Sequence, residues 1–131
     1  MALEGKALEL FEGPNFAHLA TVNPDGSPQV SPVWVHARDG LIEVNTSRGR
    51  VKDRNMSRDP RVALSITDAK DPYVRASVQG EVLEAIEEGA VEHIDFLSEK
   101  YDGVTPYPRL TPGMVRVIYR IRPVRVNVTG G

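Results

Sequence analysis

The chain has 131 residues, of which 40% are hydrophobic, and a formal net charge of −2 at pH 7. This length predicts one domain, residues 1–131, with enough apolar side chains for a core. The sequence has no cysteine, which excludes disulfides and thiolate chemistry. It shows neither the apolar run of a signal peptide nor the roughly 20 apolar residues that span a bilayer, so we expect a cytoplasmic protein with no membrane partner.

Short strands joined by tight turns dominate the first part of the chain. The expected elements, in chain order, are a helix over 2–11 and strands over 16–22, 29–35 and 41–45. The turns at 23–26 and 38–40 are too short for a crossover between parallel strands, so we expect antiparallel pairing. Pro32 cannot donate to a ladder, which predicts that its strand lies at an edge or carries a bulge.

The second part of the chain continues the β pattern with two further helices. Its expected elements are helices over 51–57 and 87–101, strands over 62–67 and 73–85, and a long strand from 115 onward. In that last strand the apolar residues occupy odd positions up to Ile121 and even positions from Val124. This change of phase predicts a bulge or bend at Pro123. The sum is a mainly β (α+β) fold, a six-stranded antiparallel split β-barrel with short flanking helices.

A basic segment follows the third expected strand and is the strongest functional signal in the sequence. It places six cations within residues 48–61: Arg48, Arg50, Lys52, Arg54, Arg58 and Arg61. A strand-to-helix turn offers free N–H groups and the positive end of a helix dipole, so it suits a phosphate. The alternative is a solvated charged helix in which Asp53 and Asp59 neutralise their neighbours.

Other types of site have little support. The P-loop and the dinucleotide-binding fingerprint are both absent, no His, Asp or Glu grouping has the spacing of a metal site, and no catalytic residue can be named. Of the three histidines, we expect His18 to be structural and His93 to be solvated, while His36 has the best chance of facing a cleft. The acidic overall balance, with no aromatic residue in the basic segment, argues against nucleic acid as a partner.

Residues 50–62 resemble the FMN-binding split-barrel superfamily typified by pyridoxamine-phosphate oxidase. They are most similar to its branch that uses the deazaflavin coenzyme F420, in which a Lys-x-x-Asn-(apolar)-x-x-Asp-Pro-Arg pattern follows strand three. The residues that fit this pattern are Lys52, Asn55, Met56, Asp59, Pro60 and Arg61. The segments 19–34 and 79–81 also resemble the superfamily's first hairpin and a recurrent strand.

The resemblance implies a homodimer with the cofactor in a groove at its interface. By position, Arg50 and Lys52 would hold the cofactor phosphate, and Thr46 and Ser47 would add hydroxyl donors. The residues that would line the tricyclic ring are Val30, Ser31, Pro32, Val33 and Trp34. Further contacts would come from Val51, Arg54 and Asn55, although Asn55 could instead brace the helix.

The implied function is an oxidoreductase that transfers hydride between F420 and an unsaturated or conjugated small molecule. An FMN-binding oxidase or reductase of the same fold, and a non-catalytic flavin or deazaflavin carrier, are the alternatives. The sequence has a single tryptophan and lacks the C-terminal Trp and Arg motif of true pyridoxamine-phosphate oxidases, which argues against vitamin B6 oxidation. Tyr101 and Tyr107 are further candidates for the substrate side, or else pack against the barrel. Arg116, Arg120 and Arg122 on the last strand are candidates for contact with an anionic tail, or else are solvated.

Overall fold

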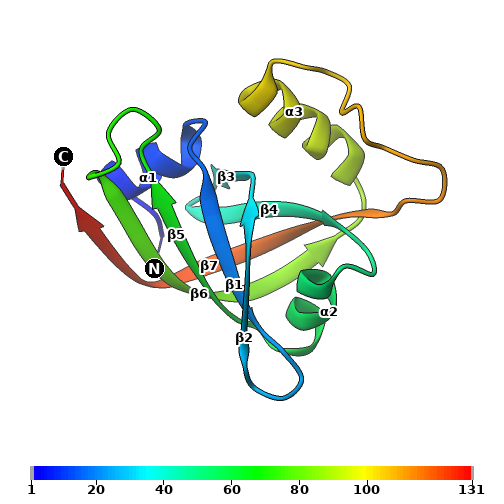
Figure 1. The fold of residues 1–131 in the computed structure, drawn as a ribbon, viewed down its shortest axis with the longest axis horizontal. Helices are drawn as coiled ribbons and strands as arrows, with labels where there is room; N and C mark the ends of the chain where they lie inside the picture. The colour runs from blue at the N-terminus through cyan, green and yellow to red at the C-terminus, as the bar shows by residue number, and fades with distance from the viewer. Residues whose placement is uncertain (1, 131) are drawn as a thin grey trace.

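Seven antiparallel strands form one sheet that curls into a half-barrel, with three helices around it (Figure 1). The computed structural model describes residues 2–130. Its elements are α1 (Gly5–Glu12), β1 (Ala17–Val22), β2 (Pro28–Val33), β3 (Val35–Arg38), β4 (Leu41–Ser47), α2 (Val51–Arg58), β5 (Arg61–Thr67), β6 (Arg75–Ile86), α3 (Ala90–Asp102) and β7 (Arg116–Thr129). None of the described helices combines the length and apolarity that a membrane crossing needs.

The two edges of the sheet are joined in the chain by one residue. The strand order is β2-β1-β5-β6-β7-β4-β3, so β2 and β3 lie at opposite edges, and only Trp34 separates them in sequence. The covalent connection therefore brings the edges together where no ladder joins them. This confirms the mainly β split-barrel prediction but corrects the strand number from six to seven.

The expected strand over 29–35 divides because its two ends pair with different partners. Val33 pairs with Ala17 on β1, whereas Val35 pairs with Val44 on β4, and both valines are buried. The chain thus crosses from one edge to the other while keeping its apolar residues in the core. Pro32 lies on the edge strand β2, as its missing N–H group predicts.

The core lies inside the curled sheet and is closed at one end by α1. Phe11 of α1, Leu19 of β1, Ile42 of β4 and Tyr119 of β7 are among its largest fully buried side chains. Burial of each such side chain contributes on the order of 1.5–3 kcal/mol. Strand β5 alternates buried and exposed residues, because only one of its faces meets this core, whereas β4 is buried along nearly its whole length.

The last strand bends where the apolar phase changes. The register of β6 against β7 shifts between Gln79 and Gly80, which leaves Val124 as an extra residue beside Pro123. This confirms the predicted bulge. A Cβ atom at Gly80 would lie 2.7 Å from Cγ2 of Ile121, so glycine permits the close approach of the two strands at the bend.

Helix α3 packs on β4 with a face that includes a histidine. Ile94 and Leu97 are buried as expected, but His93 is also buried, and the prediction that it is solvated is wrong. The reason lies on β4, where Glu43 and Asn45 offer polar partners that allow the imidazole to be buried. These contacts join distant parts of the sequence, so the pattern of α3 alone does not reveal them.

Candidate functional site

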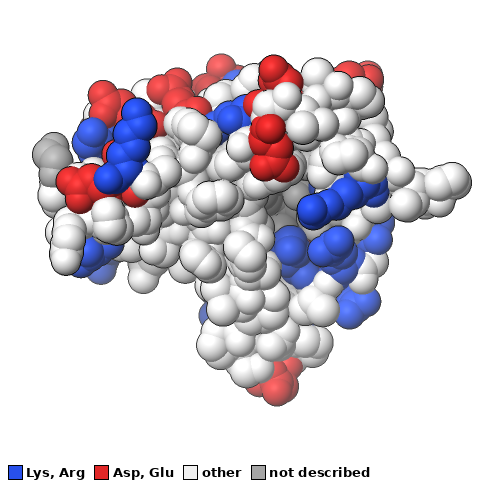
Figure 2. Space-filling model, turned by 45° about the horizontal axis from the view of Figure 1, so that its top comes forward, with Lys and Arg blue, Asp and Glu red and all other residues white. Residues whose placement is uncertain are grey.

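A cleft of about 330 Å³ opens between α2 and α3, beside the β2–β3 junction. Figure 2 shows Lys and Arg side chains gathered around a hollow on this face of the molecule. The cleft is lined by Phe16, Pro32, Val33, Trp34, Asn45, Thr46, Arg50, Lys52, Ile94, Tyr107, Arg109 and Arg116. Its walls divide into a cationic part and an aromatic part, and each part constrains what the cleft can bind.

Four cations line the cleft without a counter-ion. They are Arg50, Lys52, Arg109 and Arg116, and within residues 2–130 none of them forms an ion pair. Lys52 donates instead to Oγ of Ser31, at 3.1 Å, and Arg116 donates through Nε to Oδ1 of Asn45, at 2.8 Å. Neutral acceptors of this kind leave the positive charge available for a ligand.

The pKa values of two cleft cations are lowered, mainly by burial and in part by neighbouring positive charge. Burial lowers the pKa of Lys52, and the positive charges of Arg50 and Arg116 lower it further. Burial also lowers the pKa of Arg116; Tyr107 acts in the opposite direction, and Arg50 adds to the lowering. Three mutually repelling cations are held close together at a free-energy cost that a bound anion would relieve.

The N-terminus of α2 adds backbone donors to the same region. Arg50 is the N-cap residue of α2 and makes no side-chain capping bond. The first N–H groups of a helix have no partner within the helix, and the helix dipole makes this end positive. Since the side chains of Arg50 and Lys52 line the cleft, the start of α2 reinforces their attraction for an anion.

Aromatic rings form the other part of the cleft. The Trp34 ring stacks on Tyr101, with centroids 5.4 Å apart and planes 7° apart, and meets Tyr107 edge-on at 6.0 Å. The hydroxyl of Tyr101 donates to the carbonyl of Asn15 at 2.7 Å, and burial raises the pKa of Tyr101 to about 12. These contacts hold the Trp34 ring in the wall of the cleft, where it offers a flat apolar surface. The combination suits a ligand with a planar ring and an anionic group.

The family model described as pyridoxamine 5'-phosphate oxidase matches residues 3–129, nearly the whole chain. The chain belongs to this family. The structure is similar to one described as an F420 reductase, with a TM-score of 0.83 and 31% sequence identity over 95% of this chain and 98% of that chain.

Two further solved structures share the fold of this chain. A conserved hypothetical protein from Mycobacterium tuberculosis has a TM-score of 0.74 and 26% identity, over 98% of this chain and 86% of that one. HupZ from Group A Streptococcus has a TM-score of 0.70 and 16% identity, over 98% of this chain and all of its own, and at this identity it shows the fold alone.

The structure brings half of the sequence-predicted site residues together in the cleft. Those that line it are Pro32, Val33, Trp34, Thr46, Arg50 and Lys52. Ser31 lies next to them through its hydrogen bond with Lys52, and Ser47 is buried at the end of β4. These residues come from β2, the β2–β3 junction, β4 and α2, which converge because the chain crosses between the sheet edges at Trp34.

The remaining predicted residues lie outside this cleft. Val30 is 64% exposed and lines a separate hollow on the outer face of the sheet, and Val51 is exposed on α2. Arg54 donates to the carbonyl of Gly49 at 2.7 Å. The side-chain amide of Asn55 donates to Thr21 and, at 3.0 Å, to the Asn23 side chain, so it ties α2 to the β1–β2 hairpin.

Several cleft residues are absent from the sequence-based set. They are Phe16, Asn45, Ile94 and Arg109, together with Tyr107, which the sequence offered only as a substrate-side candidate, and Arg116, which it offered only as a contact for an anionic tail. Arg116 enters the site because it pairs with Ser47, at the end of β4. That register depends on the order of strands in the sheet, and no local pattern in the sequence carries it.

A buried carboxylate holds the loop that precedes α2. Asp53 accepts hydrogen bonds from the hydroxyl of Tyr119 at 2.7 Å, from the backbone N–H of Gly49 at 2.9 Å and from Arg48 at 3.0 Å. Arg48 is therefore neutralised by Asp53, as the alternative interpretation of the basic segment expected, while Arg50 is left free for the cleft. Asp53 thus gives Arg48 a structural role, whereas Arg50 keeps its charge for the cleft.

We predict that Asp53→Asn makes stability less dependent on acid. Burial raises the pKa of Asp53, but the hydrogen bonds from Tyr119, Gly49 and Arg48 outweigh it, so the net pKa is lowered. Its stabilisation is therefore complete above the unfolded pKa of about 3.9 and is lost as pH falls through the lower folded value.

Urea denaturation between pH 3 and 7 would measure this effect. The variant should lose about 1–3 kcal/mol at pH 7, the range for a hydrogen bond to a charged group, and show a shallower fall in acid. Asp102→Asn, at the exposed end of α3, is the matched control and should keep the steep fall. Equal acid slopes for the two variants would contradict the role given to Asp53.

Proposed function

We propose that the protein is an oxidoreductase that uses coenzyme F420 to transfer hydride to or from an unsaturated or conjugated small molecule. One observation carries this proposal: three cations without a counter-ion, Arg50, Lys52 and Arg116, lie in one cleft with the Trp34 ring. A deazaflavin coenzyme has both a phosphate and a flat ring, so the residues present fit it. The similarity to an F420 reductase supports the same choice.

Each part of the cleft has a role in this proposal. Arg50, Lys52 and Arg116 would bind the phosphate, and the Thr46 hydroxyl is a further donor at the same cleft. The ring would lie along the segment that ends at Trp34. Arg109 adds a fourth positive charge, which favours a ligand with more than one anionic group, such as a coenzyme with an oligoglutamate tail.

The chemistry would come from the coenzyme, because a bound deazaflavin supplies the hydride. The protein would bind and orient the coenzyme, and the aromatic part of the cleft would keep water from one side of it. The Tyr101 hydroxyl is engaged with Asn15, and the raised pKa keeps its proton in place, so Tyr101 acts as a support for Trp34 rather than as a proton donor. We assign no catalytic residue.

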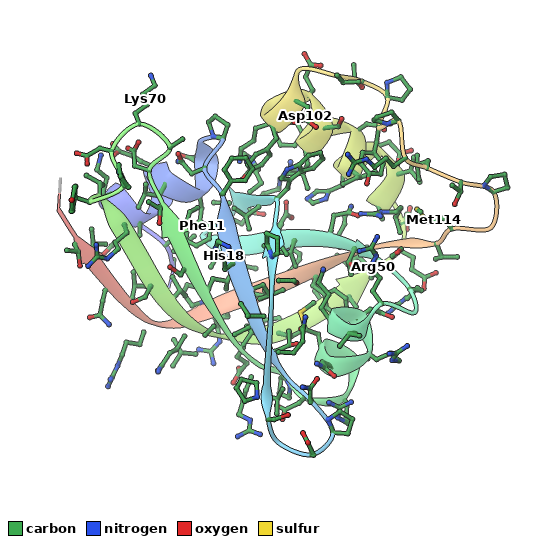
Figure 3. All side chains as sticks on the ribbon, viewed as in Figure 1. Phe11, His18, Arg50, Lys70, Asp102 and Met114 are labelled. Atoms are coloured by element: carbon green, nitrogen blue, oxygen red, sulfur yellow. The ribbon has the colours of Figure 1, made fainter. Side chains whose placement is uncertain are left out.

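A titration with F420 and with FMN tests the proposal. Trp34 is the only tryptophan and lines the cleft, so its fluorescence reports binding. We predict that F420 binds more tightly than FMN, and that Lys52→Ala weakens F420 binding by about 1–3 kcal/mol, the range for a charge-assisted hydrogen bond. Lys70→Ala is the control, since Lys70 is exposed and lies far from Arg50 in Figure 3, and it should leave binding unchanged.

Three outcomes would count against parts of the proposal. Tight FMN binding without F420 binding would replace the deazaflavin by a flavin. Unchanged affinity in Lys52→Ala would remove the phosphate assignment. Binding of F420 without turnover of any acceptor would leave a carrier in place of an enzyme.

We also propose that two copies of the chain form a homodimer through the outer face of β1, β5 and β6. Two hollows of about 400 and 460 Å³ lie there and share Ala20, Ala63 and Gln79. Val30 and Val124 are 64% and 49% exposed at this face, although both are apolar. A second copy would cover these side chains and bring Val30 into contact with a ligand at the interface, as the sequence implied.

Sedimentation equilibrium would test the dimer. We predict a species of twice 14.4 kDa for the protein and of 14.4 kDa for Ala63→Arg, because a charged side chain at the centre of the face opposes burial. Val91→Arg, at an exposed position on α3, is the matched control and should remain dimeric. A protein that is monomeric throughout the micromolar range would refute this arrangement.

A further inference from the structure

A buried chain of hydrogen bonds leads away from the cleft, and we propose that it positions Arg116 for anion binding. Its members are Arg116 of β7, Asn45 and Glu43 of β4 and His93 of α3, all between 5% and 9% exposed. In this role Asn45, His93 and Glu43 are positioning residues, which act on the ligand through Arg116. The proposal rests on the function proposed above and concerns one of its ligand-binding cations, Arg116.

The first step of the chain fixes the guanidinium. Nε of Arg116 donates to Oδ1 of Asn45 at 2.8 Å, and Nη1 lies 3.7 Å from the sulfur of Met114. The guanidinium also lies over the Tyr107 ring, with its central carbon 5.4 Å from the ring centroid. Within residues 2–130 these contacts leave Nη2 without a protein partner, so it is free to donate to an anion in the cleft.

The second step fixes the amide of Asn45. Its Nδ2 donates to the carbonyl of Ala90 at 2.9 Å and lies 3.0 Å from Nδ1 of His93. An amide rotated by 180° would place its oxygen against the Ala90 carbonyl and its NH₂ group against Nε of Arg116. Both contacts would be repulsive, so the acceptors on α3 hold Oδ1 toward Arg116.

The third step fixes the proton on His93. Because Nδ1 accepts from Asn45, the neutral ring carries its proton on Nε2, which donates to Oε1 of Glu43 at 3.2 Å. Glu43 also meets Arg120 at 3.3 Å and Arg38 at 3.8 Å. Burial raises the pKa of Glu43, but His93 and the two arginines outweigh it and lower the pKa, which keeps the carboxylate charged as an acceptor.

The chain of hydrogen bonds therefore transmits one choice of orientation from Glu43, between β4 and α3, to the cleft. Glu43 selects the tautomer of His93, His93 and the Ala90 carbonyl together select the orientation of Asn45, and Asn45 orients Arg116. Asn45 in front of the ring and Glu43 behind it satisfy both nitrogens of the buried imidazole, which fixes the ring in one orientation. Similar support of a ligand-binding group by buried partners is common around metal and active sites.

The test measures binding of inorganic pyrophosphate, a probe that carries neither a ring nor redox chemistry. The fluorescence of Trp34 reports the binding. His93→Leu removes one of the two acceptors that hold the Asn45 amide, and we expect the dissociation constant of pyrophosphate to rise about tenfold, the usual scale for one charge-assisted hydrogen bond. His93→Gln can accept from Asn45 and donate to Glu43, so it should remain within about threefold of the original protein.

A double substitution separates positioning from general damage. In an Arg116→Ala background, His93→Leu should have no further effect on pyrophosphate binding, because the cation on which it acts is gone. An equal loss in both backgrounds would overturn the proposal. Leu97→Val, which perturbs the same helix without touching the chain, is the matched control and should leave the affinity unchanged.

Asn45→Ala repeats the test from the other end of the chain, and it applies even if His93→Leu fails to fold. It removes the acceptor of Arg116 directly, so it should weaken pyrophosphate binding about tenfold, again the scale of one charge-assisted bond. An unchanged affinity would overturn the proposal, as would a protein that binds no pyrophosphate. Pyrophosphate binding that follows these predictions, without binding of F420 or FMN, would sustain the positioning chain and reject the proposed function alone.

Discussion

Trp34 alone connects the two edge strands of the sheet, and the rest of the structure depends on this connection. The chain leaves β2, which pairs with β1, and enters β3, which pairs with β4, within three residues. The sheet therefore curls until its two edges meet. Since no ladder forms between β2 and β3, the barrel stays split at this point. The cleft lies beside the split, and the tryptophan that joins the edges is also part of its wall.

The electrostatic design of the site follows from how the surrounding fold distributes charge. Asp53 neutralises Arg48 and anchors the loop before α2, whereas Glu43 meets Arg120 and sits behind His93. The carboxylates Asp53 and Glu43 thus pair with Arg48 and Arg120, outside the cleft, and within residues 2–130 no carboxylate pairs with a cation of the cleft. Burial lowers the pKa of Lys52, and the unpaired positive charges of Arg50 and Arg116 lower it further. Binding an anion would restore the balance at a place where the fold has removed it.

Much of the fold follows from the sequence because its signals are local. Turn residues and alternation located the strands, and the change of apolar phase located the bulge beside Pro123. The division of the second strand was missed because it depends on two different pairing partners on either side of Trp34. His93 was misplaced for the same reason, since the partners that make its burial favourable lie on β4.

The candidate site was foreseen where its residues are neighbours in sequence. Arg50 and Lys52 belong to one short segment whose charge density is visible without a structure, and the resemblance assigned them a phosphate. Asn45 and Arg116 come together only through the pairing of β4 with β7, a non-local contact. Val30 faces a different hollow in the single chain, so its assignment to the ring remains a prediction that depends on the dimer.

The most direct measurement is a crystal structure of the protein with coenzyme F420 bound. We expect the coenzyme phosphate within hydrogen-bond distance of Nζ of Lys52 and of the guanidinium of Arg116, with the deazaflavin ring alongside Trp34. A phosphate bound elsewhere, with the cations of the cleft in contact with water alone, would show that these unpaired cations are not the cofactor site.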